Sequence, residues 1–281
     1  MMTDLLQQVP APGSAAGRAF DELAARYDDD FTNGVLGRLL RRAVWRRLDA
    51  RFIPGSRILD LGCGTGEDAV YLAARGMRVV AIDAAEAMVA AARRKVEAGG
   101  FEHRVYVRHA AIESILETGA VGAAAVCGPV VFDGALSNFG ALNCYTGDFP
   151  ALACGLARQL RPGAPVVLVV MGRLVPWEWA WYFRRGELRR AFRRLPSNGL
   201  LWRGVSVRYP TIRTLRRAFA HSFRYRRVSA LGFLLPPTYM EPWAAWNPRM
   251  VRVLDACERR LEGIRPLAWL ADHYVLELER R

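Results

Sequence analysis

Lysine is almost absent from this chain of 281 residues. Lys95 is the only lysine among 40 lysine and arginine residues, so arginine supplies nearly all of the positive charge behind a net charge of +13. Such a bias is typical of a GC-rich bacterial genome and indicates no function by itself. An isoelectric point near 10.3 still predicts attraction to an anionic partner, whether lipid, nucleic acid or an acidic substrate.

Modules that read nucleic acid are missing as well. The sequence contains no recognisable nucleic-acid-binding motif and no appended basic domain, which argues against nucleic acid as a partner. We therefore interpret the arginines mainly as a solvated surface. Peripheral contact with an anionic membrane is the alternative.

Long uncharged apolar runs are also lacking. No stretch of about 18 such residues occurs, although 52% of the residues are hydrophobic, and this excludes an evident membrane-spanning helix. The first 17 residues contain Asp4 but neither a basic cluster nor a long apolar core, so they do not resemble a signal peptide. We expect a flexible tail over residues 1–17 and a single domain over residues 18–281.

Cysteines with the spacing of metal ligands are absent too. The five cysteines are odd in number and lie far apart, at positions 63, 127, 144, 154 and 257. We interpret them as reduced thiols without a metal site. The location that we expect is therefore the cytoplasm, with peripheral membrane contact left open.

The most informative stretch runs from Arg57 to Asp83. A short apolar run ends in three glycines at alternate positions, Gly62, Gly64 and Gly66, which let the backbone turn sharply and approach a ligand closely. A helix over 67–75 and a second apolar run over 78–82 follow, and Asp83 comes next. Such a unit predicts a nucleoside at the loop, with its ribose hydroxyls on the Asp83 carboxylate.

Glycine spacing and the preceding acid select among cofactors. NAD and FAD prefer Gly-x-Gly-x-x-Gly, which leaves a helix N-terminus free for a pyrophosphate, whereas the order here is Gly-x-Gly-x-Gly with Asp60 just before it. An acid at that place repels a diphosphate but attracts the ammonium group of an amino acid. S-adenosylmethionine, which has a cationic end and no phosphate, matches best, and a nicotinamide cofactor is the rival.

The segment Leu59-Asp-Leu-Gly-Cys-Gly-Thr-Gly66 resembles the first motif of class I S-adenosylmethionine-dependent methyltransferases. The resemblance covers the chain from about Phe20 to its end. It implies an α/β fold, with a doubly wound, seven-stranded, mostly parallel sheet, an antiparallel last strand and helices on both faces. Two helical cap insertions, over 172–210 and 234–271, interrupt it.

The resemblance also implies which residues hold the cofactor. In the family a Phe-Asp…Tyr-Asp helix often folds over the cofactor, and Phe20, Asp21, Tyr27 and Asp28 match it; Tyr27 is then a lid residue, or a tyrosine packed under a helix. The acid that usually takes the adenine amino group after the third strand is missing from His109-Ala-Ala-Ile112. The cofactor-binding candidates are Tyr27, Asp60, Gly62, Cys63, Gly64, Gly66, Asp83, Ala84, Met88, Ala111, Ile112, Ser137 and Asn138.

Residues 137–145 resemble the loop after the fourth strand in small-molecule methyltransferases, such as the glycine and amino-sugar N-methylating enzymes. Seven of the eight tryptophans lie in the two insertions, which suits a flat or greasy substrate or a helix lying on a bilayer. The alternative is that these rings form the core of the cap itself or a dimer contact. The substrate candidates are Phe31, Phe139, Asn143, Trp177, Tyr182 and Tyr239.

No side chain stands out as a general base. Glu178 and Glu241 are candidates because burial among aromatic residues raises the pKa of a carboxylate, and Asn138 can orient an acceptor. We predict methyl transfer from S-adenosylmethionine to a small hydrophobic or aromatic acceptor, at oxygen or nitrogen because these are commoner in the family. The alternatives are a lipid or prenylated, quinone-like acceptor at a membrane surface, and a catalytically silent cofactor-binding partner subunit.

Overall fold

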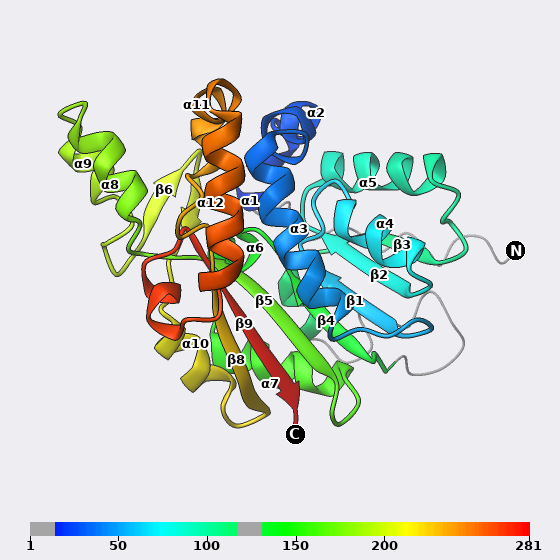
Figure 1. Ribbon diagram of the computed structural model, residues 1–281. Helices are drawn as coiled ribbons and strands as arrows, with labels where there is room; N and C mark the ends of the chain where they lie inside the picture. Colours follow the sequence, from blue (N-terminus) through cyan, green and yellow to red (C-terminus); the bar gives the residue numbers. More distant parts are fainter. Residues whose placement is uncertain (1–14, 117–130) are drawn as a thin grey trace, which may run out of the picture.

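The computed structural model describes residues 15–116 and 131–281. Seven strands form one sheet in the order β3-β2-β1-β4-β5-β9-β8, which can be followed in Figure 1. β1 to β5 run parallel, and β9 is antiparallel to both of its neighbours. The bounds are β1 (Arg57–Leu61), β2 (Arg78–Asp83), β3 (Val105–His109), β4 (Gly134–Ser137), β5 (Pro165–Met171), β8 (Phe223–Leu231) and β9 (His273–Arg280).

This topology confirms the doubly wound, mostly parallel sheet with an antiparallel last strand. The last strand lies inside the sheet, between β5 and β8, and not at its edge. Helices cover both faces, which keeps the parallel strands apolar throughout. One face packs on α7 (Phe149–Gln159) and α10 (Ile212–Phe219); the other packs on α3 (Val35–Asp49), α4 (Glu67–Ala74), α5 (Glu86–Ala98) and α12 (Pro248–Leu261).

The face of β9 that carries Glu277 is less exposed to solvent than its sequence indicates. Alternation along residues 273–279 predicts a partly wet face that carries Glu277. Glu277 is instead only 4% exposed, and its carboxylate accepts a 2.6 Å hydrogen bond from Nε of Arg51, two residues beyond α3. Because a helix covers this face, an ion pair takes the place of water around the carboxylate.

The segment before α3 is broken into short pieces. The sequence predicts one helix from Ala19 to Asp30, but the structure has α1 (Ala15–Asp21), α2 (Ala24–Tyr27) and a π-helical turn η1 (Asp28–Thr32). Three acids at the end of a helix oppose its dipole, which gives a physical reason for the change of geometry there. The tail predicted over 1–17 lies outside the described residues up to position 14, and α1 already begins at Ala15.

Each insertion has its own secondary structure. The first contains α8 (Pro176–Phe183), α9 (Leu188–Ala191) and a hairpin of β6 (Leu200–Trp202) and β7 (Val205–Val207); the second contains η3 (Thr238–Met240), α11 (Glu241–Trp246), α12 and η4 (Arg265–Trp269). α12 begins at Pro248, directly after Asn247, and proline is common at the first position of a helix. Residues 177–194 do not form one continuous helix, because the chain turns at Gly186 between α8 and α9.

Buried ion pairs and one indole join the two insertions to each other and to the sheet. Arg194 lies 2.6 Å from the carboxylate of Glu178 and 2.9 Å from that of Asp272. The Trp177 indole donates a 2.9 Å hydrogen bond to the carbonyl of Leu234. In the described ranges, no helix combines the length and the apolar character needed to span a bilayer.

Candidate functional site

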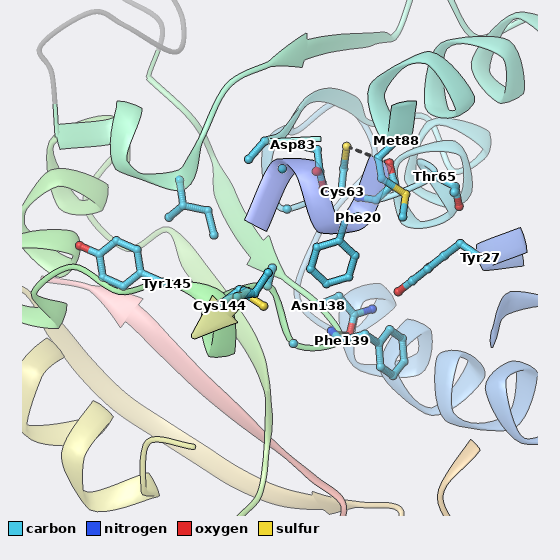
Figure 2. A pocket seen from close by; sticks show the side chains of 18 of the residues that line it. Phe20, Tyr27, Cys63, Thr65, Asp83, Met88, Asn138, Phe139, Cys144 and Tyr145 are labelled. Carbon is cyan, nitrogen blue, oxygen red and sulfur yellow. Dashed lines mark hydrogen bonds between the residues drawn. The ribbon is translucent and has the colours of Figure 1, made fainter. Parts of the chain in front are cut away.

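A cleft opens where the parallel strands end, and it contains about 1170 Å³ of space free of protein atoms, its open mouth included. Figure 2 shows side chains from the N-terminal helices, the glycine loop and the segment after β4 pointing into it. Its lining includes the candidates Tyr27, Gly62, Cys63, Gly64, Asp83, Ala84, Met88, Ile112, Asn138 and Phe139. The structure therefore brings most of the cofactor-binding candidates together in one cavity.

The three glycines of the loop have different surroundings. A side chain at Gly62 would collide with Ala141, and one at Gly66 would come within 2.8 Å of the Cβ of Ala92. At Gly64 the nearest atom is a ring carbon of Tyr27, 4.0 Å away. Gly62 and Gly66 are thus needed for packing, whereas Gly64 leaves room for a ligand, and its φ of +54° suits a residue without Cβ.

Asp83 ties the glycine loop to the end of β2. One carboxylate oxygen accepts the Gly64 N–H at 2.8 Å, and the other accepts the Ala85 N–H at 2.9 Å. Burial raises the pKa of this carboxyl group, although these two amides and His109 lower it. Since each carboxylate oxygen has a second lone-pair direction, Asp83 can also accept hydrogen bonds from a ribose.

Asp60 has a buried carboxylate oxygen without a hydrogen-bond partner. Its side chain is 1% exposed, and no hydrogen-bond donor reaches its Oδ2. Burial, and then the charges of Asp68 and Asp83, raise the pKa of Asp60 well above its usual value. Asp60 is the fourth of the five residues of β1, two positions before Gly62, and is not among the residues that line the cleft. An ammonium group bound beside the loop would supply a compensating charge.

The end of the cleft beyond β3 contains an acid that the sequence analysis missed. Ile112 lines the cleft as expected, and Glu113, the next residue in the turn η2 (Ile112–Leu116), lines it too. Ala111 is not among the lining residues. Glu113 is therefore the carboxylate nearest in sequence to the place where the family has its adenine-binding acid.

An ion pair borders the opposite end of the cleft. Arg41 of α3 and Asp68 of α4 are 6% and 5% exposed, line the cleft, and approach to 2.9 Å. The indole of Trp45 donates to the same carboxylate at 2.7 Å and the amide of Asn138 donates at 2.8 Å. Arg41 is the one basic side chain among the described lining residues, and no acceptor reaches its Nε.

Aromatic rings surround this arginine. Its guanidinium lies 5.0 Å from the ring centre of Phe139 and 5.6 Å from that of Phe31. Phe139 has a φ of +42°, and its N–H donates to the Asn138 side chain, so a strained residue is held in place beside the cleft. Burial raises the pKa of Tyr27 to about 12, and Figure 2 shows its hydroxyl directed toward Asn138 and Phe139.

The N-terminal segment is fixed over the cleft by its acids. Asp21 accepts the N–H of Ala87 at the start of α5, at 2.8 Å. Asp28 accepts the hydroxyl of Thr65 at 2.7 Å and pairs with Lys95 at 2.9 Å. Because Phe20 and Tyr27 line the cleft beside these contacts, the segment has the position expected of a lid.

The structure keeps both glutamate candidates away from the cleft. Glu178 is buried against Arg193 and Arg194, and burial raises its pKa in the predicted direction. Glu241 accepts the N–H groups of Val35 at 2.5 Å and Leu36 at 3.0 Å, so it caps α3. Neither carboxylate lines the cleft, and each already has structural partners.

Several other candidates also have structural surroundings. Asn143 of α6 (Ala141–Cys144) accepts the Met171 N–H at 2.9 Å and donates to the Arg208 carbonyl at 2.7 Å, and Ser137 donates to the Leu61 carbonyl at 2.9 Å. Trp177 packs on Trp243, and Tyr182 on Tyr239, with ring centres 6.0 Å apart in each pair. These cap rings do not line the cleft and pack on one another within the cap. Tyr182 is buried there, whereas Tyr239 is 39% exposed, so the alternative of a cap core fits Tyr182 and not Tyr239.

The part of the cap that does reach the cleft went unnoticed in the sequence. Val205 and Ser206 of β7 line it, together with Cys144, Tyr145 and Thr146 after β4. Val205 packs with Ala19 of α1, so the first insertion meets the N-terminal segment there. No sequence motif marks this hairpin, whose contact with α1 joins residues far apart in the chain.

Comparisons with known proteins point to one family. Residues 58–163 match the family described as "Methyltransferase domain". Demethylmenaquinone methyltransferase from Beutenbergia cavernae is 46% identical over 88 residues, which cover 30% of this chain and 35% of that protein. Ubiquinone/menaquinone biosynthesis C-methyltransferase UbiE from Geotalea daltonii is 35% identical over 109 residues, covering 37% and 45%. The chain thus spans less than half the length of the curated relatives it matches.

A solved structure supports the fold over a longer range. The S-adenosylmethionine dependent methyltransferase from Mesorhizobium loti matches with a TM-score of 0.51 and covers 85% of this chain and 98% of that one. At 21% sequence identity this match speaks for the fold alone. Most residues that line the cleft lie within the matched range, and the others come from the N-terminal segment, α3 and the first insertion.

Proposed function

We propose that this chain, which carries a class I S-adenosylmethionine-dependent methyltransferase domain, transfers a methyl group to a small hydrophobic acceptor with an acidic hydroxyl on or beside its reacting ring. The bound cofactor supplies an activated methyl group on a sulfonium. The protein's residues bind both ligands, orient them and exclude water. The observation that carries the proposal is the buried, unpartnered Oδ2 of Asp60 beside a glycine loop that leaves room for a ligand.

The residues present fit this cofactor. Asp60 can pair with its ammonium group and Asp83 with its ribose hydroxyls, and a phosphate-bearing cofactor would face the uncompensated charge of Asp60. Ile112 can pack on the adenine ring. We propose that Glu113 accepts a hydrogen bond from the adenine amino group. Glu113 then takes the place of the acid that the family has nearer to the third strand.

The acceptor end favours a molecule that reacts as an oxyanion. Arg41 can stabilise a phenolate or enolate, because it keeps its charge at any physiological pH and its Nε has no acceptor. The Tyr27 phenol, with its raised pKa, stays protonated and can donate a second hydrogen bond. Phe20 and Phe139, which line the cleft, supply an apolar wall for a ring, and Phe31 packs behind Phe139 without lining the cleft.

An oxyanion of this type needs no dedicated base in the protein. An acidic hydroxyl loses its proton to water, and the negative charge on the acceptor then activates either the oxygen or a ring carbon next to it. The carbon–sulfur bond of the sulfonium breaks as the new bond to the methyl group forms, and S-adenosylhomocysteine leaves. After transfer to a ring carbon, the product is a ketone with an acidic hydrogen on that carbon, and loss of this proton to water restores the ring. This matches the lack of a free carboxylate or histidine at the acceptor end of the described cleft. The relative from Geotalea daltonii is named a C-methyltransferase, which favours carbon over the oxygen or nitrogen that the sequence suggested.

The experiment is incubation with methyl-labelled S-adenosylmethionine and hydroxylated naphthalenes, phenols and 1,3-dicarbonyl compounds, followed by mass spectrometry and ¹³C NMR of the methylated product. We expect label in an acidic ring compound, on carbon. Methylation of amines alone, or labelled S-adenosylmethionine bound without any transfer, would contradict the proposal; the latter result would support a silent partner subunit.

Variants of two residues test the assignment of the acceptor end. Arg41→Lys keeps the positive charge but loses the planar guanidinium group with its several N–H donors. It should lower kcat/KM for the acceptor at least tenfold, while the affinity for S-adenosylhomocysteine stays within threefold of wild type. Tyr182→Ala, in the cap core, is the matched control and should leave both quantities within threefold. A loss of cofactor affinity in Arg41→Lys would assign the arginine to the cofactor instead.

A further inference from the structure

Helices α8 and α9 form a hairpin whose end presents apolar side chains to solvent. Phe183, Leu188 and Phe192 are 44%, 58% and 44% exposed. The ring centres of Phe183 and Phe192 lie 5.6 Å apart. The Phe192 N–H donates to the Leu188 carbonyl, so these two residues are one helical turn apart and share a face, and we group the three side chains as one patch. We call this patch, with the neighbouring Arg184, Arg185 and Arg189, the hairpin tip.

The charges around the patch are almost all positive. Arg185 stacks on the Trp181 ring at 3.5 Å, and Arg190 pairs with Glu187, the only acid between Phe183 and Phe192. Within the described ranges, no carboxylate lies within 4.0 Å of Arg184 or Arg189. An anionic bilayer can bind both kinds of side chain, because its acyl boundary takes up aromatic and aliphatic groups and its headgroups attract arginines that have no acidic partner.

The hairpin tip and the cleft belong to the same end of the molecule. α8 follows β5 after four residues, at the carboxyl ends of the parallel strands, and in Figure 1 the hairpin projects outward from that end. After α9 the chain is anchored by the ion pair of Arg194 with Asp272 and leads to β7, which lines the cleft. A surface bound at the tip would therefore lie beside the cleft mouth.

We propose that the hairpin tip docks on an anionic membrane, from which the enzyme takes a lipidic or prenylated acceptor. The inference rests on the proposed function for the identity of the ligand, but the docking itself does not. A bilayer suits the tip better than a protein partner, because a stable protein interface buries about 800 Å² on each side and the tip offers three apolar side chains on a convex projection. Phe183, Leu188 and Phe192 enter the boundary of headgroups and acyl chains, and the arginines pair with lipid phosphates.

Vesicle flotation with the full chain tests this proposal. Wild-type protein should float with phosphatidylglycerol vesicles at low salt, should float less at high salt, and should not float with phosphatidylcholine vesicles. Both F183S/L188S/F192S and R184Q/R185Q/R189Q should lose at least tenfold in partitioning. The matched control R213Q/R216Q/R217Q removes three exposed arginines from α10, outside the tip, and should stay within twofold of wild type.

Unchanged affinity for S-adenosylhomocysteine shows that each variant is folded and that its cofactor site is intact. Equal losses in the control and in the tip variants would overturn the proposal, since the binding would then follow net charge. Failure of wild type to float at low salt overturns it as well, as does a dimer that the tip variants dissociate while flotation persists. Methyl transfer to a water-soluble acceptor reports on the proposed function separately, and the tip variants should retain it.

Discussion

The carboxylate of Asp68 lies 2.9 Å from the guanidinium of Arg41, and both side chains are buried where they border the cleft. The pair links α3, which precedes the sheet, to α4, which follows the glycine loop. Removing one partner of such a pair leaves a charge buried without compensation, which costs about 3–5 kcal/mol of stability.

We therefore predict that Asp68→Ala lowers the free energy of unfolding by about 3–5 kcal/mol, as measured in urea. The double variant Arg41→Met/Asp68→Leu should be more stable than Asp68→Ala, because neither charge then remains. If the single variant stays within about 1 kcal/mol of wild type, a range usual for exposed ion pairs, the pair is more hydrated than its burial indicates.

Asp60 makes the cofactor-free protein less stable at neutral pH. Its raised folded-state pKa means that the unfolded chain ionises first as the pH rises above about 3.9, so stability falls until the pH passes the folded-state pKa. Asp60→Asn removes this effect. Its melting temperature without cofactor should exceed that of wild type by a margin that grows with pH from about 4 upward. A margin independent of pH would show that Asp60 does not carry a raised pKa.

Two glycines of the loop should respond differently to substitution. Gly62→Ala places a methyl group on Ala141 and should impair folding, as followed by circular dichroism and melting temperature. Gly64→Ala meets no atom closer than 4.0 Å, so it should cost only the strain of its positive φ, about 1–2 kcal/mol. Gly64→Val should occlude the loop and weaken S-adenosylhomocysteine binding with the fold intact. Equal melting temperatures for the two alanine variants would refute this distinction.

Glu241 should matter for stability and not for chemistry. Glu241→Ala leaves the N–H groups of Val35 and Leu36 without their acceptor and should cost about 1–2 kcal/mol of unfolding free energy. Turnover of the folded variant should stay within threefold of wild type. A hundredfold loss of kcat at unchanged stability would restore Glu241 as a general base.

Sequence reasoning predicted the part of the site that is local in the chain. The strand, glycine loop, helix and acid between Arg57 and Asp83 lie in one continuous unit, so their spacing alone indicates their arrangement. The mostly parallel, seven-stranded sheet and its antiparallel last strand followed from the resemblance to a known family. The hydrogen bond from the Gly64 N–H to the Asp83 carboxylate forms within that local unit.

The rest of the site depends on contacts between distant segments. Glu241 caps a helix that begins 206 residues earlier, and Val205 meets the N-terminal lid, yet nothing in the local sequence marks either contact. The aromatic insertions appeared to be a substrate cover because composition does not show which ring faces which. Trp177 packs on Trp243 and Tyr182 packs on Tyr239, both within the cap. Arg41 borders the cleft, but nothing in the sequence distinguishes it from the many other arginines.

Isothermal titration with two ligands tests the central claim that this cleft binds S-adenosylmethionine through Asp60 and Asp83. S-adenosylhomocysteine carries the amino-acid part, and 5′-methylthioadenosine lacks it. Wild type should bind both; Asp83→Ala should weaken both by about 2–3 kcal/mol, whereas Asp60→Asn should weaken S-adenosylhomocysteine by a similar amount and leave 5′-methylthioadenosine within threefold. Wild type that binds neither ligand, or Asp83→Ala with unchanged affinities, would contradict the account.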